Sequence, residues 1–375
     1  MSVPHFHPLV VKRVTPEAAG AVSLSFGIPP ELQELYRFTP GQFLTLRATI
    51  GAEAVRRSYS ICSSTQHFAA QGEIEVGIKP VEGGLFSNWA PQLQAGDTVD
   101  VMPPEGRFTP RSSGAVHRVG WAAGSGITPL LSIIASTLAG EAGSSFTLVY
   151  CNQRSSSILF NEALQDLKDR YPARLNLIHV LSRQPQEVAL FNGRLDASKV
   201  SALLASLIPA ASIDETFICG PEAMIEGCEQ ALLAAGIPRE RIHSERFTSA
   251  GQPANAINSG AAFDQAAGAE GQNGSKTAGG ASGEVRLSVQ LDGKAHELRM
   301  FAHERVLDVA LAAGLDLPYS CKGGVCCTCR ARVLDGQVAM EKNFTLEDWE
   351  VKKGFVLSCQ ARPLTDHVTI SYDDR

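Results

Sequence analysis

The pattern of hydrophobic and polar positions changes twice along the chain and divides it into three parts with different predicted elements. Up to residue 112, short runs with apolar residues at alternate positions predict β-strands separated by Gly and Pro. These strands are expected at 9–14, 21–28, 42–49 and 73–79. Short strands at such close spacing indicate a small antiparallel β-barrel.

In the second part, residues 113–248, β-like runs alternate with segments of helical periodicity. Strands are predicted at 118–123, 145–151, 175–181, 216–219 and 242–247, and helices at 130–138, 160–170, 198–208 and 222–235. This alternation predicts a doubly wound parallel α/β domain. Such a sheet binds its ligands at the carboxyl ends of the strands.

The third part, residues 284–375, opens with a predicted hairpin. Alternating residues at 285–290 and 295–300 flank the turn signal Asp292-Gly293, and a helix is predicted at 306–313. Between the second and third parts, residues 249–283 consist mostly of Ala, Gly, Ser, Asn and Gln. This composition cannot bury a core, so we expect a flexible linker there.

Composition and charge narrow the possible functions. The chain has 375 residues, of which 44% are hydrophobic and 19% charged, and its formal net charge is -6. This charge argues against a nucleic-acid partner. The N-terminus lacks the pattern of a signal peptide, and the longest apolar stretch, at 127–138, is too short to span a bilayer. Nine Cys without secretion signals predict reduced thiols and a cytoplasmic location.

Four cysteines near the C-terminus follow a metal-ligand spacing. Cys321, Cys326 and Cys329 stand as C-x4-C-x2-C, and Cys359 follows alone. Three thiolates on one loop and a fourth from a distance are typical of a plant-type [2Fe-2S] cluster. A structural zinc site would usually show two short Cys pairs, and a disulfide cluster would need an oxidising compartment. We interpret Cys327 as a fifth thiol that is not a ligand.

From about Glu284 to the C-terminus the chain resembles the plant-type ferredoxins. The order of hairpin, helix and cluster loop is the order expected of that family, so the resemblance implies a β-grasp fold. A one-electron carrier at the end of a long chain implies an electron source earlier in the chain.

Two short segments of the first part carry candidate cofactor chemistry. Arg56 to Ser60 reads Arg-Arg-Ser-Tyr-Ser, and a Gly pair at Gly83 and Gly84 opens a short helix. Each is weak alone, because Arg-x-Tyr-Ser is frequent by chance and Gly often precedes a helix. A helix start can nevertheless bind a diphosphate. In this order, with Pro104 to Phe108 after them, the segments resemble the FAD domain of the ferredoxin–NADP reductase family.

This resemblance implies a role for each matching residue. Arg57 would pair with the FAD diphosphate, Tyr59 would stack on the isoalloxazine, and Ser60 would hydrogen-bond near the reactive flavin nitrogen. The cofactor-binding residues implied in this part are Arg57, Ser58, Tyr59, Ser60, Lys79, Gly84, Leu85, Phe86 and Ser87.

The second part contains two further segments that resemble the same family. The turn Gly124-Ser125-Gly126, with Thr128 after it, differs from the G-x-G-x-x-G fingerprint but looks like the family's nicotinamide-dinucleotide loop. Cys219, Gly220, Pro221 and Met224 match its Cys-Gly-Pro motif, in which the Cys lies beside the nicotinamide. The alternative for Cys219 is a small buried strand residue. The resemblance also implies that Glu245 and Phe247 lie near the flavin, with Ser60, Cys219 and Glu245 as the catalytic residues.

The choice of nucleotide depends on the adenosine ribose. A NAD site usually offers a carboxylate to the ribose, whereas a NADP site offers Arg to its phosphate. Residues 152–157 contain no acid, and Arg154, Ser182, Arg183 and Arg194 suit a 2′-phosphate. We therefore expect NADPH rather than NADH, the alternative being that these are solvated loop charges.

The order of the three parts predicts electron transfer from NADPH through FAD and the cluster to another protein. The whole chain except the linker resembles the reductases of multicomponent oxygenases. Within them, the nearest resemblance implies a di-iron oxygenase partner that epoxidises a CoA-bound ring in phenylacetate degradation. Alternatives are the reductase of another oxygenase, of a demethylase or of a hybrid-cluster protein, and a redox sensor or zinc scaffold without enzyme activity.

Overall fold

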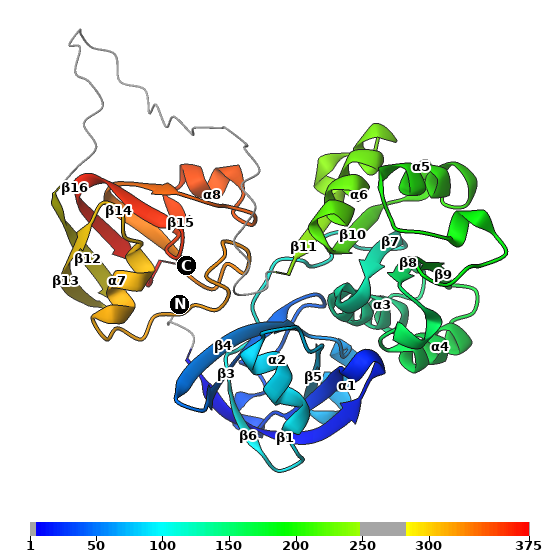
Figure 1. Cartoon of the computed structure of the whole chain (residues 1–375), viewed down its shortest axis with the longest axis horizontal. Helices are drawn as coiled ribbons and strands as arrows, with labels where there is room; N and C mark the ends of the chain where they lie inside the picture. Colours follow the sequence, from blue (N-terminus) through cyan, green and yellow to red (C-terminus); the bar gives the residue numbers. More distant parts are fainter. Residues whose placement is uncertain (1–4, 248–282, 375) are drawn as a thin grey trace, which may run out of the picture.

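Three β-sheets form three bodies in the computed structural model, which describes residues 5–247 and 283–374 (Figure 1). The first sheet is antiparallel and has six strands, the second is parallel and has five, and the third is mixed and has five. This confirms the predicted barrel, parallel α/β domain and ferredoxin domain. The predicted linker lies outside the described residues, except for Gly283.

The barrel sheet has the strand order β4-β3-β6-β1-β2-β5. Its elements are β1 (His7–Pro16), β2 (Val22–Gly27), β3 (Phe43–Ile50), β4 (Glu53–Ser60), α1 (Thr65–Gln71), β5 (Glu73–Ile78), α2 (Leu85–Trp89) and β6 (Thr98–Val101). An antiparallel bridge between Ile61 and Val76 joins the end of β4 to β5 and closes the barrel. Strand β6 was not among the predicted strands, because its four residues are too short for an alternating pattern to show.

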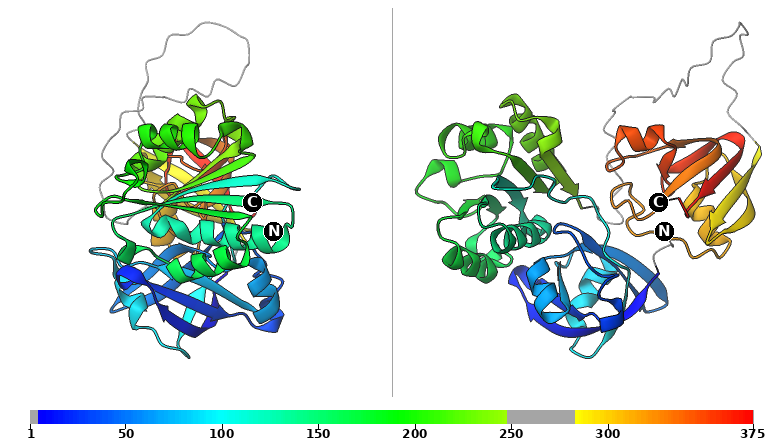
Figure 2. Two further views of the ribbon diagram at one scale, coloured as in Figure 1. Left: turned by 90° about the vertical axis from the view of Figure 1, so that its right-hand side faces the viewer. Right: turned by 180° about the vertical axis from the view of Figure 1, so that it is seen from behind.

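The parallel sheet has the order β11-β10-β7-β8-β9, with helices on both faces (Figures 1 and 2). Its elements are β7 (His117–Ala123), α3 (Ile127–Gly140), β8 (Ser145–Asn152), α4 (Asn161–Arg170), β9 (Leu175–Leu181), α5 (Ala197–Ser206), β10 (Glu215–Gly220), α6 (Glu222–Ala234) and β11 (Ile242–Arg246). Helices α3 and α4 cover one face, and α5 and α6 cover the other. The strand order reverses beside β7, so the carboxyl ends of β7 and β10 flank the usual ligand crevice of this fold.

The third sheet has the order β13-β12-β16-β14-β15. Its elements are β12 (Glu284–Leu291), β13 (Lys294–Phe301), α7 (Val306–Ala312), β14 (Arg330–Met340), α8 (Asp348–Lys352), β15 (Phe355–Leu357) and β16 (Ala361–Ser371). The predicted hairpin joins β12 and β13, and its turn residues Asp292 and Gly293 both have positive φ, at 51° and 72°. Two positive φ values are the requirement of the tight turn that Asp-Gly favours. Strand β12 then pairs in parallel with β16, which completes the β-grasp topology.

No helix in residues 5–247 and 283–374 combines the length and the hydropathy needed to cross a membrane.

A buried ionic network ties the parallel sheet to the segment that enters it from the barrel. The fully buried side chain of Arg118 donates to Glu215 at 3.1 Å, to Glu141 at 2.7 Å and to the Ser112 carbonyl at 2.6 Å. Glu215 also accepts from the backbone N–H of Arg111 at 2.7 Å and contacts His243 Nε2 at 2.9 Å. Buried charges persist only when they are paired and hydrogen-bonded.

We predict that Arg118→Ala lowers the free energy of unfolding by about 3 kcal/mol, because it leaves the buried Glu215 carboxylate without its main cation. Urea denaturation followed by circular dichroism measures this loss. Arg37→Ala removes an exposed pair with Glu34 and is the matched control, with an expected loss of about 0.5 kcal/mol or less. Equal losses in the two variants would contradict a stabilising role for the buried network.

Candidate active site and metal centre

The four predicted cluster ligands are brought together between the loop after α7 and the turn between β15 and β16. Hydrogen bonds between side chains pair Cys321 with Cys326, and Cys329 with Cys359. Cys329 and Cys359 are buried, whereas Cys321 and Cys326 are partly exposed. In the described part of the chain, no three His, Cys, Asp or Glu side chains are placed as ligands of one ion. Two thiol pairs instead suit a two-iron centre, in which each iron takes two thiolates.

Hydrogen-bond donors surround these sulfurs. The N–H of Gly323 donates to Cys321 Sγ at 3.3 Å, and Gln360 Nε2 donates to Cys359 Sγ at 3.5 Å. The hydrogen bond from Cys326 lowers the pKa of Cys321, and that from Cys329 lowers the pKa of Cys359. The thiolate is the form of cysteine that binds iron. These residues fit a [2Fe-2S] cluster.

Backbone geometry supports the same interpretation of the loop. Gly324 has a φ of +79°, and a Cβ there would approach the Lys342 carbonyl to 3.0 Å. Cys327 has a φ of 59°, and its sulfur lies 3.0 Å from Thr345 Oγ1. This contact gives Cys327 a partner outside the four paired thiols, as expected of a non-ligand.

The three predicted catalytic residues meet where the barrel touches the carboxyl edge of the parallel sheet. Ser60, at the end of β4, donates to Glu245 Oε2 at 3.2 Å. Glu245 in β11 lies opposite Cys219 in the parallel pairing of β10 with β11. Side chains that are up to 185 positions apart in the sequence thus form one predicted catalytic group.

The surroundings of this predicted catalytic group favour the uncharged forms of Glu245 and Cys219. Burial raises the pKa of Glu245 to about 8, while the hydrogen bond from Ser60 acts in the opposite direction. At neutral pH the carboxyl is therefore mostly protonated and able to hold or pass a proton. Burial, with a smaller contribution from the Glu245 charge, raises the pKa of Cys219 well above its ordinary value. Cys219 is fully buried, so it acts as a neutral contact surface rather than as a thiolate.

The predicted flavin-binding residues line β4 and the start of α2. The ring of Tyr59 packs on that of Phe86 with their centroids 5.5 Å apart, and Arg57 Nη1 donates to the Arg56 carbonyl at 2.7 Å. Phe86 is 1% exposed, so only its backbone can face a cofactor. Ser87 Oγ accepts from the N–H of Val81 at 3.3 Å and fixes the turn before α2.

In the turn before α2, only a glycine fits at position 84. A Cβ on Gly84 would come within 2.5 Å of Ser87 Oγ, whereas the neighbouring Leu85 side chain is 43% exposed. A side-chain-free turn with the unpaired N–H groups of a helix start fits a diphosphate. The roles of these residues toward FAD stay predictions.

The dinucleotide turn packs directly against the Cys-Gly-Pro segment. A Cβ on Gly126 would lie 2.0 Å from the Cys219 carbonyl, so only glycine fits. Lys79 Nζ lies 4.0 Å from the position of a Cβ on Gly124, which brings the barrel cation to the same turn. Thr128 Oγ1 donates to the Ser125 carbonyl at 3.0 Å, and this bond uses its hydroxyl inside the turn. The arrangement can bind a diphosphate beside Cys219.

The remaining nucleotide residues lie at the same edge of the sheet. Pro221 caps α6, and the Met224 sulfur lies 2.9 Å from the position of a Cβ on Gly220. Ser155 donates through its N–H and its hydroxyl to Gln184 Oε1, at 3.0 and 3.1 Å, and so joins the loops after β8 and β9. Phe247, at the end of the first described range, is 44% exposed.

Arg154, Arg183 and Arg194 are exposed in and beside these two loops, and Ser182 lies with them. Within the described residues none of the three guanidinium groups forms an ion pair. They are therefore available to an anionic ligand.

Two contacts were missed by the sequence reasoning. Ser58 donates its hydroxyl to Ser320 Oγ at 2.7 Å, so its side chain contacts the ferredoxin domain, and its predicted role toward a cofactor stays a prediction. Its neighbour Arg56, to which no role was given, forms an ion pair with Asp316. The alternation of side chains along a strand could have predicted both contacts. Positions 56 and 58 must lie on the opposite face from positions 57 and 59, so they face away from the predicted flavin site.

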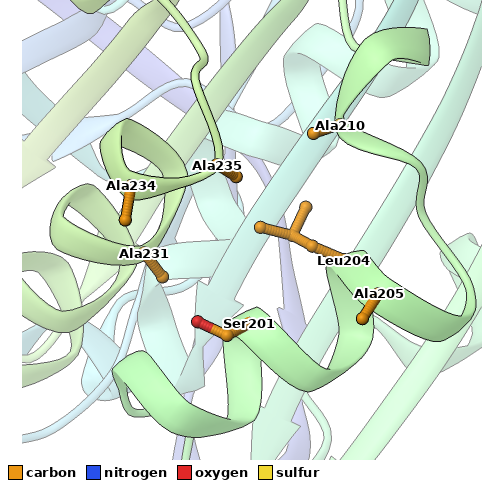
Figure 3. Close-up of a pocket in the computed structure, with 7 residues that line it drawn as sticks. All are labelled: Ser201, Leu204, Ala205, Ala210, Ala231, Ala234 and Ala235. Atoms are coloured by element: carbon orange, nitrogen blue, oxygen red, sulfur yellow. The ribbon is translucent and has the colours of Figure 1, made fainter.

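A groove of about 330 Å³ between α5 and α6 lies away from these residues (Figure 3). It is lined by Ser201, Leu204, Ala205, Ala210, Ala231, Ala234 and Ala235. Its one hydroxyl, on Ser201, donates to the Ala197 carbonyl. The groove therefore lacks the charged groups that a dinucleotide needs.

Known proteins match all three domains. Residues 9–109 match the oxidoreductase FAD-binding domain, residues 121–230 the oxidoreductase NAD-binding domain, and residues 289–364 the 2Fe-2S iron-sulfur cluster binding domain. The chain is 44% identical to a component of the 1,2-phenylacetyl-CoA epoxidase of Escherichia coli (strain K12), over 98% of each chain. It is 36% identical to the ferredoxin reductase component of 3-ketosteroid-9-alpha-monooxygenase of Rhodococcus rhodochrous, over 97% of this chain and 96% of the relative.

A solved structure shares the fold over the same length. Phthalate dioxygenase reductase superposes with a TM-score of 0.57 and 20% identity, over 98% of each chain. The chain belongs to the ferredoxin–NADP reductase family, in the group whose members carry a C-terminal [2Fe-2S] ferredoxin domain and include the relative from phenylacetyl-CoA epoxidase. It is an oxidoreductase.

We predict that Cys359→Ser abolishes the iron–sulfur absorption but leaves nucleotide-driven reduction of an artificial dye, because the flavin residues lie in the other domains. Iron and labile sulfide analysis measures the first effect. Cys327→Ser is the matched control and should retain the cluster, since Cys327 contacts Thr345. A full iron content in Cys359→Ser would exclude it as the fourth ligand.

Proposed function

We propose that this chain is a reductase component that passes electrons from NADPH, through FAD and a [2Fe-2S] cluster, to a di-iron oxygenase of the phenylacetyl-CoA epoxidase type. The observation that carries the proposal is the 44% identity to an epoxidase component along 98% of the chain. The pairing of four thiols in one domain and the Ser60–Glu245 contact between the other two provide further support.

The cofactors supply the redox chemistry, and the residues of the chain position them. FAD, when bound, accepts a hydride and returns its electrons singly, which a one-electron cluster requires. The turn at Gly124–Gly126 binds and orients the nucleotide diphosphate, and buried Cys219 forms the wall beside the nicotinamide. Tyr59 covers the flavin ring, and the protonated Glu245 holds a proton near the reacting atoms.

NADPH is the proposed electron donor because of the unpaired cations at the carboxyl edge of the sheet. Arg154 and Arg183 lie in loops joined by the bond between Ser155 and Gln184, and Arg194 follows nearby in the chain. Guanidinium groups bind phosphate through charge-assisted and bidentate hydrogen bonds. No carboxylate in 152–157 competes for the ribose.

A reducing, cytoplasmic environment is the proposed location. None of the nine cysteines forms a disulfide in the structure, and reduced cysteines suit a compartment that glutathione and thioredoxin keep reducing.

We predict that a di-iron oxygenase and this chain together convert phenylacetyl-CoA to an epoxidised product with NADPH, and that neither protein does so alone. Product analysis by mass spectrometry measures this. The oxygenase of a 3-ketosteroid monooxygenase is the comparison partner, because a relative of that kind is 36% identical. Turnover of the reductase with the ketosteroid oxygenase, but not with the di-iron oxygenase, would overturn the proposed partner. A purified protein that lacks flavin and iron–sulfur absorption would instead favour a redox sensor or a zinc scaffold.

We predict that Arg183→Ala raises the KM for NADPH about tenfold and leaves the KM for NADH nearly unchanged, because one charge-assisted contact to the 2′-phosphate is lost. Steady-state dye reduction measures both constants. Arg170→Ala, which removes an exposed arginine at the end of α4, is the control and should alter neither. A wild-type protein with the lower KM for NADH, and unaffected by Arg183→Ala, would contradict NADPH as the donor.

A further inference from the structure

Strand β4 presents different chemistry on its two faces. Side chains alternate along a strand, so Arg57 and Tyr59 lie on one face and Arg56 and Ser58 on the other. The first pair belongs to the flavin-binding set. The second pair contacts the ferredoxin domain, which lies beside the barrel (Figures 1 and 2).

Arg56 is held by several groups from the segment that leads into the cluster loop. It donates to Asp316 Oδ1 at 2.7 Å and to the Leu317 carbonyl at 3.0 Å, and its guanidinium carbon lies 4.4 Å from the Tyr319 ring centroid. Its side chain is 11% exposed. Cation–π and ionic contacts made together in a partly desolvated place are stronger than either on an open surface.

A second contact fixes the other side of the loop. Glu350, at α8, is fully buried and accepts from Arg107 of the barrel through both guanidinium nitrogens, one at 2.7 Å. It also accepts from Arg330 at 3.0 Å, and Arg330 follows the ligand Cys329 directly. A carboxylate this deeply buried requires its cations, so separating the two domains would leave Glu350 with only Arg330.

A third set of contacts continues the same interface. Arg111 donates to Glu347 at 2.9 Å, and Ser58 donates to Ser320 at 2.7 Å. Ser58 precedes Tyr59, and Ser320 precedes the ligand Cys321. One hydrogen bond therefore joins the neighbours of a predicted flavin-stacking residue and of a predicted cluster ligand.

We propose that Arg56 and Arg107 of the barrel, with Asp316 and Glu350 of the ferredoxin domain, form a docking latch that sets the rate of electron transfer from flavin to cluster. This inference rests on the proposed function. When bound, FAD would give up the two electrons of each NADPH singly, the second only after the cluster has passed the first to the oxygenase component. The latch residues hold position and undergo no redox change.

The exposure of the partners makes the latch reversible. One partner of each pair is exposed, Arg107 at 36% and Asp316 at 67%, whereas Glu350 and Arg56 are 0% and 11% exposed, so dissolved ions screen these contacts only in part. Salt weakens exposed ion pairs and leaves apolar packing intact. The docked state should therefore lose population as ionic strength rises.

The test is stopped-flow reduction of the purified holoprotein by NADPH, with flavin and cluster absorption followed separately. Arg107→Ala should leave flavin reduction within about twofold of wild type and slow cluster reduction at least about tenfold, because only the second step uses the interface. Arg107→Lys keeps the charge and should recover part of the rate. Arg37→Ala removes an exposed barrel arginine that pairs with Glu34 of the barrel itself, and is the control.

Hydrogen exchange provides a readout that needs no electron transfer. Amides of 316–320 and 347–352 should exchange faster in Arg107→Ala than in wild type or Arg37→Ala, and wild type should approach the variant at high salt. Unchanged exchange with unchanged cluster reduction would overturn the latch. A protein whose flavin is not reduced by NADPH would instead contradict the proposed function, and the exchange data would still decide whether the domains dock.

Discussion

The pleat of strand β4 is the constraint on which the arrangement of the molecule depends. Because successive side chains point in opposite directions, one strand of eight residues can serve two neighbours. Arg57 and Tyr59, which are predicted to bind the flavin, lie on one face, while Arg56 and Ser58 on the other reach the ferredoxin domain. At the strand end, Ser60 reaches Glu245 of the parallel sheet. A single strand thus contacts both of the other domains.

The two junctions of the barrel differ in their physical character. Toward the parallel sheet, packing is close: a Cβ on Gly77 would come within 2.6 Å of Thr128 Cγ2, and Ser132 donates to the Ser63 carbonyl at 2.7 Å. Arg118 and Glu215 of the parallel sheet also hold the connecting segment from the barrel, through the Ser112 carbonyl and the Arg111 N–H. Hydride transfer needs reacting atoms held in a narrow range of geometry, and dense packing supplies this.

Toward the ferredoxin domain, the contacts are chiefly arginine–carboxylate pairs, and several of these side chains are partly exposed. Such contacts have defined geometry, yet water and salt can replace them. A junction of this kind suits a carrier that must receive electrons from one protein surface and deliver them to another. In this position the buried Glu350 is paired both with Arg107 of the barrel and with Arg330 of its own domain, as a buried carboxylate requires.

Short patterns in the sequence were enough to predict the three folds and to name candidate site residues in each domain. Cysteine spacing, the Gly-Ser-Gly turn and the Asp292-Gly293 hairpin are patterns in which the residue types follow from nearby geometry, as the positive φ of Gly324 and the tight fit of Gly126 show. The contacts between domains became visible only once the chain was folded. Arg107 meets Glu350 across 243 positions, and Ser60 meets Glu245 across 185. No pattern in the sequence predicts which distant residue an arginine or a glutamate will contact. That pairing depends on how whole domains pack, and not on a requirement of the local backbone.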